Sequence, residues 1–169
     1  MKKKKNIVKF LLIFAVFVFS GCGIYSFTGA SYGTAKTVSI DYFQNRSTYV
    51  NATLSNTITE ALKDRFVSQT PLSLVKSGGD LHFEGTITGY SITSVGIKSG
   101  ETASYNRLTI TLKVVFTNET APENDFDKSY SRYSDYDVTS SFASVESALV
   151  EEITQQLIDD IFNDSVVNW

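Results

Sequence analysis

The stretch Arg107-Leu108-Thr109-Ile110-Thr111-Leu112-Lys113-Val114-Val115-Phe116 alternates apolar and polar residues almost without a break. Successive side chains of a strand point to opposite faces, so this period of two predicts a strand with one apolar and one polar face. Residues 81–92 alternate in the same way with a phase shift at Gly89, which predicts a β-bulge there. The tyrosine-rich residues 126–136 predict a third strand. Turn-forming segments join the three runs, so we expect three consecutive antiparallel strands.

Two other segments repeat apolar residues every four positions, which is the pattern of an amphipathic helix. The first begins after Asn51, a suitable N-cap, and ends before Pro71, and its repeat is Leu54, Ile58, Leu62 and Phe66. The second follows Ser141, and its repeat is Val145, Leu149, Ile153, Leu157 and Ile161. Each predicted helix therefore has one apolar stripe that must be buried.

An alternating run over 36–42 adds a first strand before the first helix, and residues 72–75 are a candidate for a further short strand. The main element order is strand, helix, strand, strand, strand, helix. We expect an α+β fold in which two helices pack on one face of a mixed, mostly antiparallel sheet of about four strands. The other face carries polar side chains, which are either exposed to water or in contact with a partner.

The N-terminus has the composition of a bacterial signal peptide. Five lysines precede or begin an apolar run over 10–19 that is too short to span a bilayer, and Ser20-Gly21-Cys22 follows. This ending resembles the lipoprotein signal, in which the peptide is removed before the cysteine and acyl chains such as palmitate anchor the protein to the membrane through Cys22. We expect the signal at 1–21, the lipidated N-terminus and linker at 22–35, and a single domain at 36–169. The alternative is an ordinary secretory signal with a chance cysteine.

Composition narrows the function classes. Removal of the signal takes away five of the 15 lysine and arginine residues and leaves 10 against 18 acidic residues, a net charge near −8. We therefore expect no nucleic-acid partner. Cys22 is the only cysteine and His82 the only histidine, which disfavours a disulfide or a metal site. Glu84 follows His82 on the same strand face, but no recognisable nucleophile accompanies the pair, so we predict no enzyme, no metal and no cofactor.

Six short segments spread through nearly all of the mature chain carry a family resemblance. They are residues 22–29, 38–43, 62–66, 79–85, 106–110 and 160–163. In their order, and together with the lipoprotein signal, they resemble the lipopolysaccharide-assembly lipoprotein family, LptE, in the form found in Bacteroidetes-like bacteria. The resemblance implies an outer-membrane lipoprotein that plugs the LptD β-barrel, helps it to assemble and assists lipopolysaccharide delivery to the outer leaflet.

Lys98, Arg107 and Lys113 form the densest basic group of the mature sequence, on a predicted hairpin tip and the strand that returns from it. Such cations bind phosphate, arginine through forked contacts. We expect them to contact the phosphates of lipopolysaccharide, while ordinary solvated charges are the simpler alternative.

A different function is also open, namely an outer-membrane-anchored module that binds protein or glycan through the polar sheet face. Location separates the two functions. Residues 23–32 after Cys22 carry no charge, which favours the periplasmic side or the barrel lumen over the cell surface.

Overall fold

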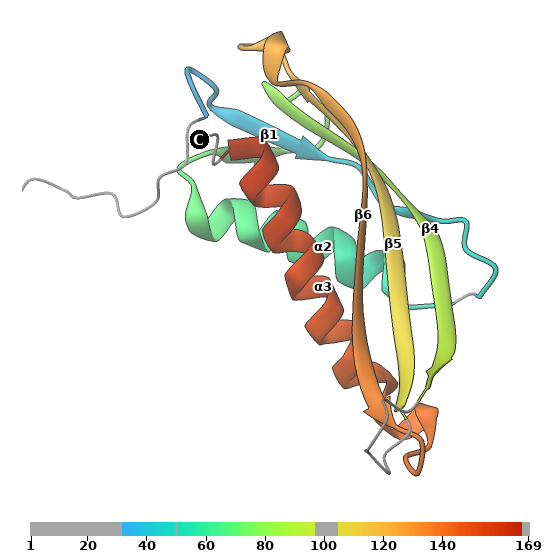
Figure 1. Cartoon of the computed structure of the whole chain (residues 1–169). Helices are drawn as coiled ribbons and strands as arrows, with labels where there is room; N and C mark the ends of the chain where they lie inside the picture. Colours follow the sequence, from blue (N-terminus) through green and yellow to red (C-terminus); the bar gives the residue numbers. More distant parts are fainter. Residues whose placement is uncertain (1–31, 50, 97–104, 167–169) are drawn as a thin grey trace, which may run out of the picture.

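The computed structural model describes residues 32–49, 51–96 and 105–166. Two helices cover the same face of a six-stranded sheet (Figure 1). The strands are β1 (Thr37–Ile40), β2 (Gln44–Asn45), β3 (Ser73–Val75), β4 (Leu81–Val95), β5 (Tyr105–Asn118) and β6 (Phe126–Asp137). The helices are α2 (Leu54–Gln69) and α3 (Phe142–Val166), and the short 3₁₀ helix η1 (Pro122–Asn124) joins β5 to β6. The predicted α+β class is confirmed.

The strands follow the order β3-β1-β4-β5-β6, and β2 pairs separately with β4. β1 runs parallel to both β3 and β4, whereas β4, β5 and β6 are antiparallel. The sheet is therefore mixed, as expected. Its six strands exceed the predicted number of about four by β3, which is the candidate short strand at 72–75, and by β2, which has only two residues and was not expected. A strand that short has too few residues to show a period of two.

The predicted β-bulge is confirmed in the middle of β4. Ile87 pairs with Leu112 and Gly89 with Thr111, so Thr88 is an extra residue on its strand. An extra residue reverses which side chains face the core. Phe83 and Ile87 are buried before the bulge, and Tyr90 is buried after it.

The two apolar stripes predicted from the sequence form the core between the helices and the sheet. Their fully buried members include Leu54, Ile58, Leu62 and Phe66 on α2, and Ile153, Leu157 and Ile161 on α3. The Phe66 ring lies 5.1 Å from the rings of both Phe83 and Phe162, measured between centroids. The stripes therefore meet each other over the apolar face of the sheet, as predicted.

Asn51 lies two residues before the N-cap of α2, which is Thr53 and makes no side-chain capping hydrogen bond, so the predicted cap is slightly too early. The side-chain oxygen of Asn51 accepts the backbone N–H groups of Thr53 and Leu54, each at 3.0 Å. At the other end, the N–H and hydroxyl of Thr70 both donate to the Phe66 carbonyl before Pro71. Within the described ranges, no helix has the length and apolar character needed to cross a membrane.

Polar pairs tie β6 to α3 along the border of the sheet. The Arg132 guanidinium donates twice to the Asp160 carboxylate at 2.6 Å, and this contact raises the pKa of Arg132. Lys128 and the Tyr130 hydroxyl both donate to Asp164, at 3.0 and 2.9 Å. These pairs explain how a strand rich in polar residues packs beside a helix.

Candidate binding face

The polar face is the surface of β4, β5 and β6 that points away from the helices. On β5 it carries Arg107, Thr109, Thr111 and Lys113. Their cross-strand neighbours are mostly small hydroxyl residues, namely Thr86, Ser91 and Thr93 on β4 and Ser129 and Ser131 on β6. Thr111 and Ser131 are hydrogen-bonded through their hydroxyls at 3.0 Å. The predicted alternation is therefore correct, and this face offers many hydrogen-bond donors and acceptors but little net charge.

Arg107 is held firmly on this face. Its guanidinium donates to both oxygens of Asp135, at 2.7 and 2.8 Å, and lies 3.5 Å from the centre of the Tyr133 ring. The contact raises the pKa of Arg107 and lowers the pKa of Asp135, because each ion favours the charged form of the other. Tyr133 is 51% exposed. The three side chains form a flat, rigid group that presents an aromatic ring and a cation to solvent.

Lys113 lies on the same face as Arg107, six residues along β5. This separation corresponds to about 20 Å along a strand. Its ammonium is 3.0 Å from the Asp127 carboxylate. The other predicted site residues, Cys22 and Lys98, lie outside the described residues. The structure thus brings the two described cations onto one face, each with its own carboxylate partner.

Tyr133, Asp135 and Asp127 are the residues of this face that the sequence reasoning did not assign to a site. All three stand on β6, in the tyrosine-rich run that the sequence predicts only as a strand. Their pairing with β5 follows from the hairpin register, in which Arg107 lies opposite Asp135. No local signal in the sequence specifies that register.

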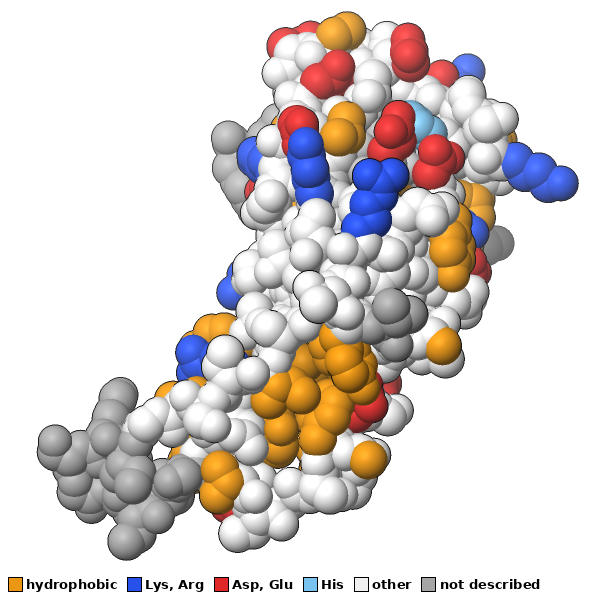
Figure 2. Space-filling view, turned by 90° about the vertical axis from the view of Figure 1, so that its right-hand side faces the viewer, with side chains coloured by type: hydrophobic (Ala, Val, Ile, Leu, Met, Phe, Trp, Pro, Cys, Tyr) orange, Lys and Arg blue, Asp and Glu red, His pale blue; other side chains and the backbone are white. Residues whose placement is uncertain are grey.

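The single histidine lies at the other end of the polar face, beside a hydroxyl and two carboxylates. His82 Nδ1 is 2.8 Å from the Ser39 hydroxyl, and Nε2 is 3.6 Å from Glu84 and 3.8 Å from Asp41. Acidic and basic side chains gather in this region in Figure 2. Ser39 is fully buried and also accepts the Gly79 N–H, so its hydroxyl stabilises the β1–β4 pairing and is not accessible to a substrate. No group of three side chains suited to a metal ion occurs in the described ranges.

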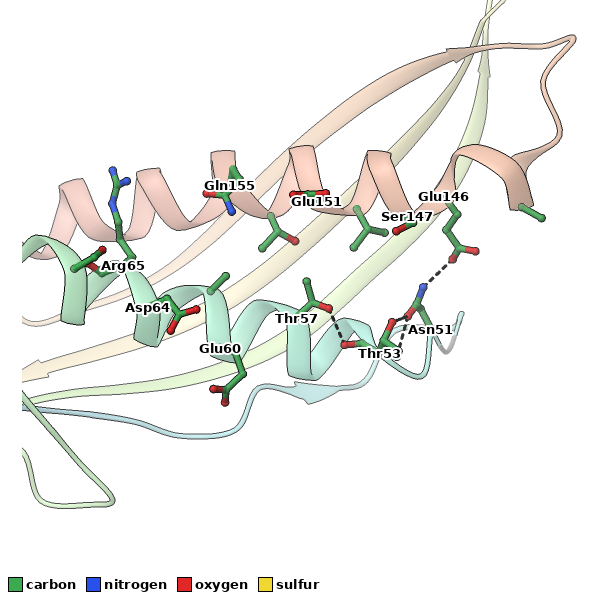
Figure 3. Close-up of a pocket in the computed structure, with 15 residues that line it drawn as sticks. Asn51, Thr53, Thr57, Glu60, Asp64, Arg65, Glu146, Ser147, Glu151 and Gln155 are labelled. Atoms are coloured by element: carbon green, nitrogen blue, oxygen red, sulfur yellow. Dashed lines mark hydrogen bonds between the residues drawn. The ribbon is translucent and has the colours of Figure 1, made fainter.

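A groove of about 780 Å³ runs between α2 and α3 on the side away from the sheet (Figure 3). Its acidic lining residues are Glu60, Asp64, Glu146 and Glu151. Arg65 is the single basic residue among the described residues that line it, and it pairs with Asp159 at 2.7 Å. This excess of negative charge disfavours phosphate binding in the groove. The polar face is therefore the better candidate for a functional surface.

Comparison with known proteins gives the family. The sequence model described as LptE, lipopolysaccharide-assembly, matches residues 35–165, which cover all six strands and nearly all of both helices. The chain belongs to the LptE family. LptE proteins are non-enzymatic lipoproteins of the cell envelope that serve lipopolysaccharide transport, and the family as a whole associates with LptD and lipopolysaccharide. The prediction that the chain is not an enzyme is therefore confirmed. A search of curated protein sequences finds no significant match.

Solved structures share the fold of this LptE protein. A hypothetical protein from Chlamydia trachomatis aligns with a TM-score of 0.53 at 9% identity, covering 79% of this chain and 99% of that one. A protein from Xanthomonas campestris also aligns with a TM-score of 0.53, at 7% identity, covering 82% of this chain and 87% of that one. At such low identities the likeness shows the fold and nothing about function.

Proposed function

We propose that this LptE protein is an outer-membrane lipoprotein that plugs the LptD barrel, helps it to assemble and assists lipopolysaccharide delivery. The observation that carries the proposal is the polar face. Its serine and threonine side chains surround two cations, Arg107 and Lys113, that each already have a carboxylate partner. The lumen of a large outer-membrane barrel is wet and polar. When a plug enters that lumen, its surface gives up hydrogen bonds to water and forms hydrogen bonds to the barrel wall. Such a surface must leave no charge without a partner.

An outer-membrane-anchored module that binds protein or glycan is the second candidate function. The exposed Tyr133 ring beside Arg107 supports it, because an aromatic face next to hydrogen-bonding groups is an amphipathic surface suited to recognition. The two candidates differ in the expected partner, since only the first requires a barrel.

Copurification tests the first function directly. We expect a tagged full-length protein, extracted from outer membranes with mild detergent, to bring down one large β-barrel protein in a one-to-one ratio. Mass spectrometry identifies the barrel, and light scattering gives the stoichiometry. Recovery of the lipoprotein alone, or normal surface lipopolysaccharide and folded barrel after its depletion, would contradict the proposed function.

Replacement of Cys22 by serine is expected to prevent lipidation. Cys22 carries the only thiol of the chain, so no other residue can take the thioether-linked diacylglycerol, and two or more acyl chains are needed for lasting attachment. We expect the Cys22→Ser protein to remain unprocessed or to appear in the soluble fraction. Intact mass of the wild type gives the second measurement. A mature N-terminus other than Cys22, or a Cys22 without acyl chains, would refute the assignment.

Removal of the cations on the polar face is expected to weaken lipopolysaccharide binding. We propose that Arg107 and Lys113, together with Lys98, contact lipopolysaccharide phosphates, which compete with Asp135 and Asp127 for the two cations. The Arg107→Ala, Lys113→Ala double variant should lose about tenfold in affinity at low salt and less at high salt.

The matched control for this double variant removes the same number of positive charges, two, from other parts of the protein. Lys63 lies on α2, where it pairs with Glu60, and Lys76 is an exposed residue that follows β3. The Lys63→Ala, Lys76→Ala protein should bind lipopolysaccharide as the wild type does. Equal binding by both double variants would rule out the ligand role of the polar face.

A further inference from the structure

The two ends of the sheet are protected against pairing with other chains. At one end β3 has only three residues. At the other end β6 points Lys128 and Arg132 toward α3, where they form ion pairs with Asp164 and Asp160. Short edge strands and inward-pointing charges are the devices by which proteins prevent edge-to-edge association. The β4 strand lacks both devices over its second half.

Beyond the bulge, β4 has a neighbouring strand on one side only among the residues that the structure describes. β1 and β2 pair with it as far as Ile87, whereas β5 pairs with it as far as Val95. Among the described residues no strand lies along the other side of Tyr90–Val95, which we call the free edge. Ser91, Ile92, Thr93 and Ser94 are all exposed, although a strand covered on one face shows alternating burial.

The backbone groups that face the free edge follow from the register. The carbonyls of Phe83 and Ile87 accept N–H groups from the β1 and β2 side. The extra residue at the bulge shifts this pattern by one, so the N–H and C=O groups of Tyr90, Ile92 and Ser94 point away from β5. The free edge has no charged residue and no proline, and its tyrosine, isoleucine, threonine and valine favour strand structure.

An apolar surface accompanies the free edge. Tyr49 stacks on Tyr90 with ring centroids 4.9 Å apart, and Tyr49 and Ile92 are 47% and 42% exposed. We call these three residues the apolar shelf, and hydrophobic side chains gather below the charged region on this side of the molecule in Figure 2. Glu146 accepts the Tyr90 hydroxyl at 2.7 Å and Asn51 at 2.8 Å, which holds the shelf in place. Burial and the Glu146 carboxylate raise the pKa of Tyr90, so its hydroxyl stays a donor.

We propose that the free edge takes up an extended segment of the barrel partner as an additional strand, with the apolar side chains of that segment on the shelf. This inference rests on the proposed function. Main-chain hydrogen bonds to an exposed edge supply affinity, and alternate side chains supply specificity. The segment that fits has an apolar side chain at every second position and no acidic residue near Glu146, where a like charge is repelled.

A second copy of this chain fits the free edge less well. The mature protein is strongly acidic, so two copies repel each other. Pairing over six residues also buries far less than the roughly 1,200 Å² of a stable interface. A segment of a partner that is already bound at the polar face needs no such area, because its attachment raises its local concentration to about the millimolar range.

Hydrogen exchange of the full-length lipoprotein, alone and in the copurified complex, tests this inference. In the isolated protein we expect fast exchange of the Tyr90, Ile92 and Ser94 amides, which have no partner among the strands that the structure describes. In the complex their exchange should slow by about tenfold or more. The β5 amides are the internal control, because they are already protected by strands on both sides.

The second measurement is the binding affinity of a variant with a charge placed on the apolar shelf. Ile92→Lys should leave the melting temperature nearly unchanged, because the side chain is exposed, and should raise the Kd of the complex by about tenfold. Val67, which is 57% exposed on α2, gives the control Val67→Lys, expected to bind as the wild type does.

Failure of this inference and failure of the proposed function give different results. A barrel that copurifies while the free-edge amides exchange as fast as in the isolated protein would overturn this inference and leave the proposed function intact. Protection of these amides in the isolated protein would also overturn it, by showing that a second copy or another segment of the same chain occupies the edge. Absence of any copurified barrel would overturn both.

Discussion

Replacement of Leu157 by alanine is expected to lower the free energy of unfolding by about 2 to 5 kcal/mol, the usual cost of truncating a large buried aliphatic side chain. Leu157 is fully buried in the middle of α3, within the core cluster that also includes Leu62 of α2. The variant loses the transfer free energy of the removed side-chain atoms. It also leaves a cavity that helices α2 and α3 cannot close. Leu62→Ala should have an effect of the same size, because Leu62 is equally buried on the facing helix.

Chemical denaturation of the domain without its signal gives the measurement. The control is Val67→Ala on α2, whose side chain is 57% exposed and is expected to change the free energy by less than about 0.5 kcal/mol. Unchanged stability of both leucine variants would show that the helices do not pack on the sheet as the structure has them.

Introduction of a side chain at Gly85 is expected to destabilise the protein by about 1 to 3 kcal/mol or to prevent folding. A Cβ atom at this position overlaps the ring of Phe43, which is fully buried against β4. The Phe43 backbone is fixed to α2, because its N–H donates to the Thr59 hydroxyl at 3.0 Å and Thr59 donates to the Ser55 carbonyl. The ring therefore cannot move away from β4 unless this hydrogen bond breaks. Gly85→Val therefore forces the segment after β1 away from the helix.

Melting temperature and near-ultraviolet circular dichroism measure this effect. Gly96→Val is the matched control, since no atom of the described part of the chain lies within 4 Å of a Cβ built there. Truncation of the ring should restore part of the stability, so Gly85→Ala combined with Phe43→Leu should be more stable than the sum of the single changes predicts. A Gly85→Val protein with wild-type stability would show that Phe43 does not fill this space.

Periodicity in the chain was enough to predict the long elements and the face that each one buries. The alternation over 107–116 and the four-residue repeats of both helices report burial of a whole face, and burial is the strongest determinant of local pattern. The bulge at Gly89 was visible for the same reason, because the apolar phase changes there. The lipoprotein signal is likewise one continuous segment, and the family resemblance rests on the order of short segments along the chain. Both can therefore be found without knowing the tertiary structure.

Contacts between distant segments were not predictable in this way, because they depend on which strands become neighbours and in what register. Asp160 and Asp164 stand 28 and 36 residues from Arg132 and Lys128, and nothing local marks them as partners. Ser39 reaches His82 only because β1 lies parallel to β4. The free edge exists because the pairing of β1 and β2 with β4 stops at Ile87, while the β4–β5 hairpin continues to Val95. Side-chain periodicity records whether a face is buried, whereas the partner that covers a face or an edge is decided only when the whole sheet assembles.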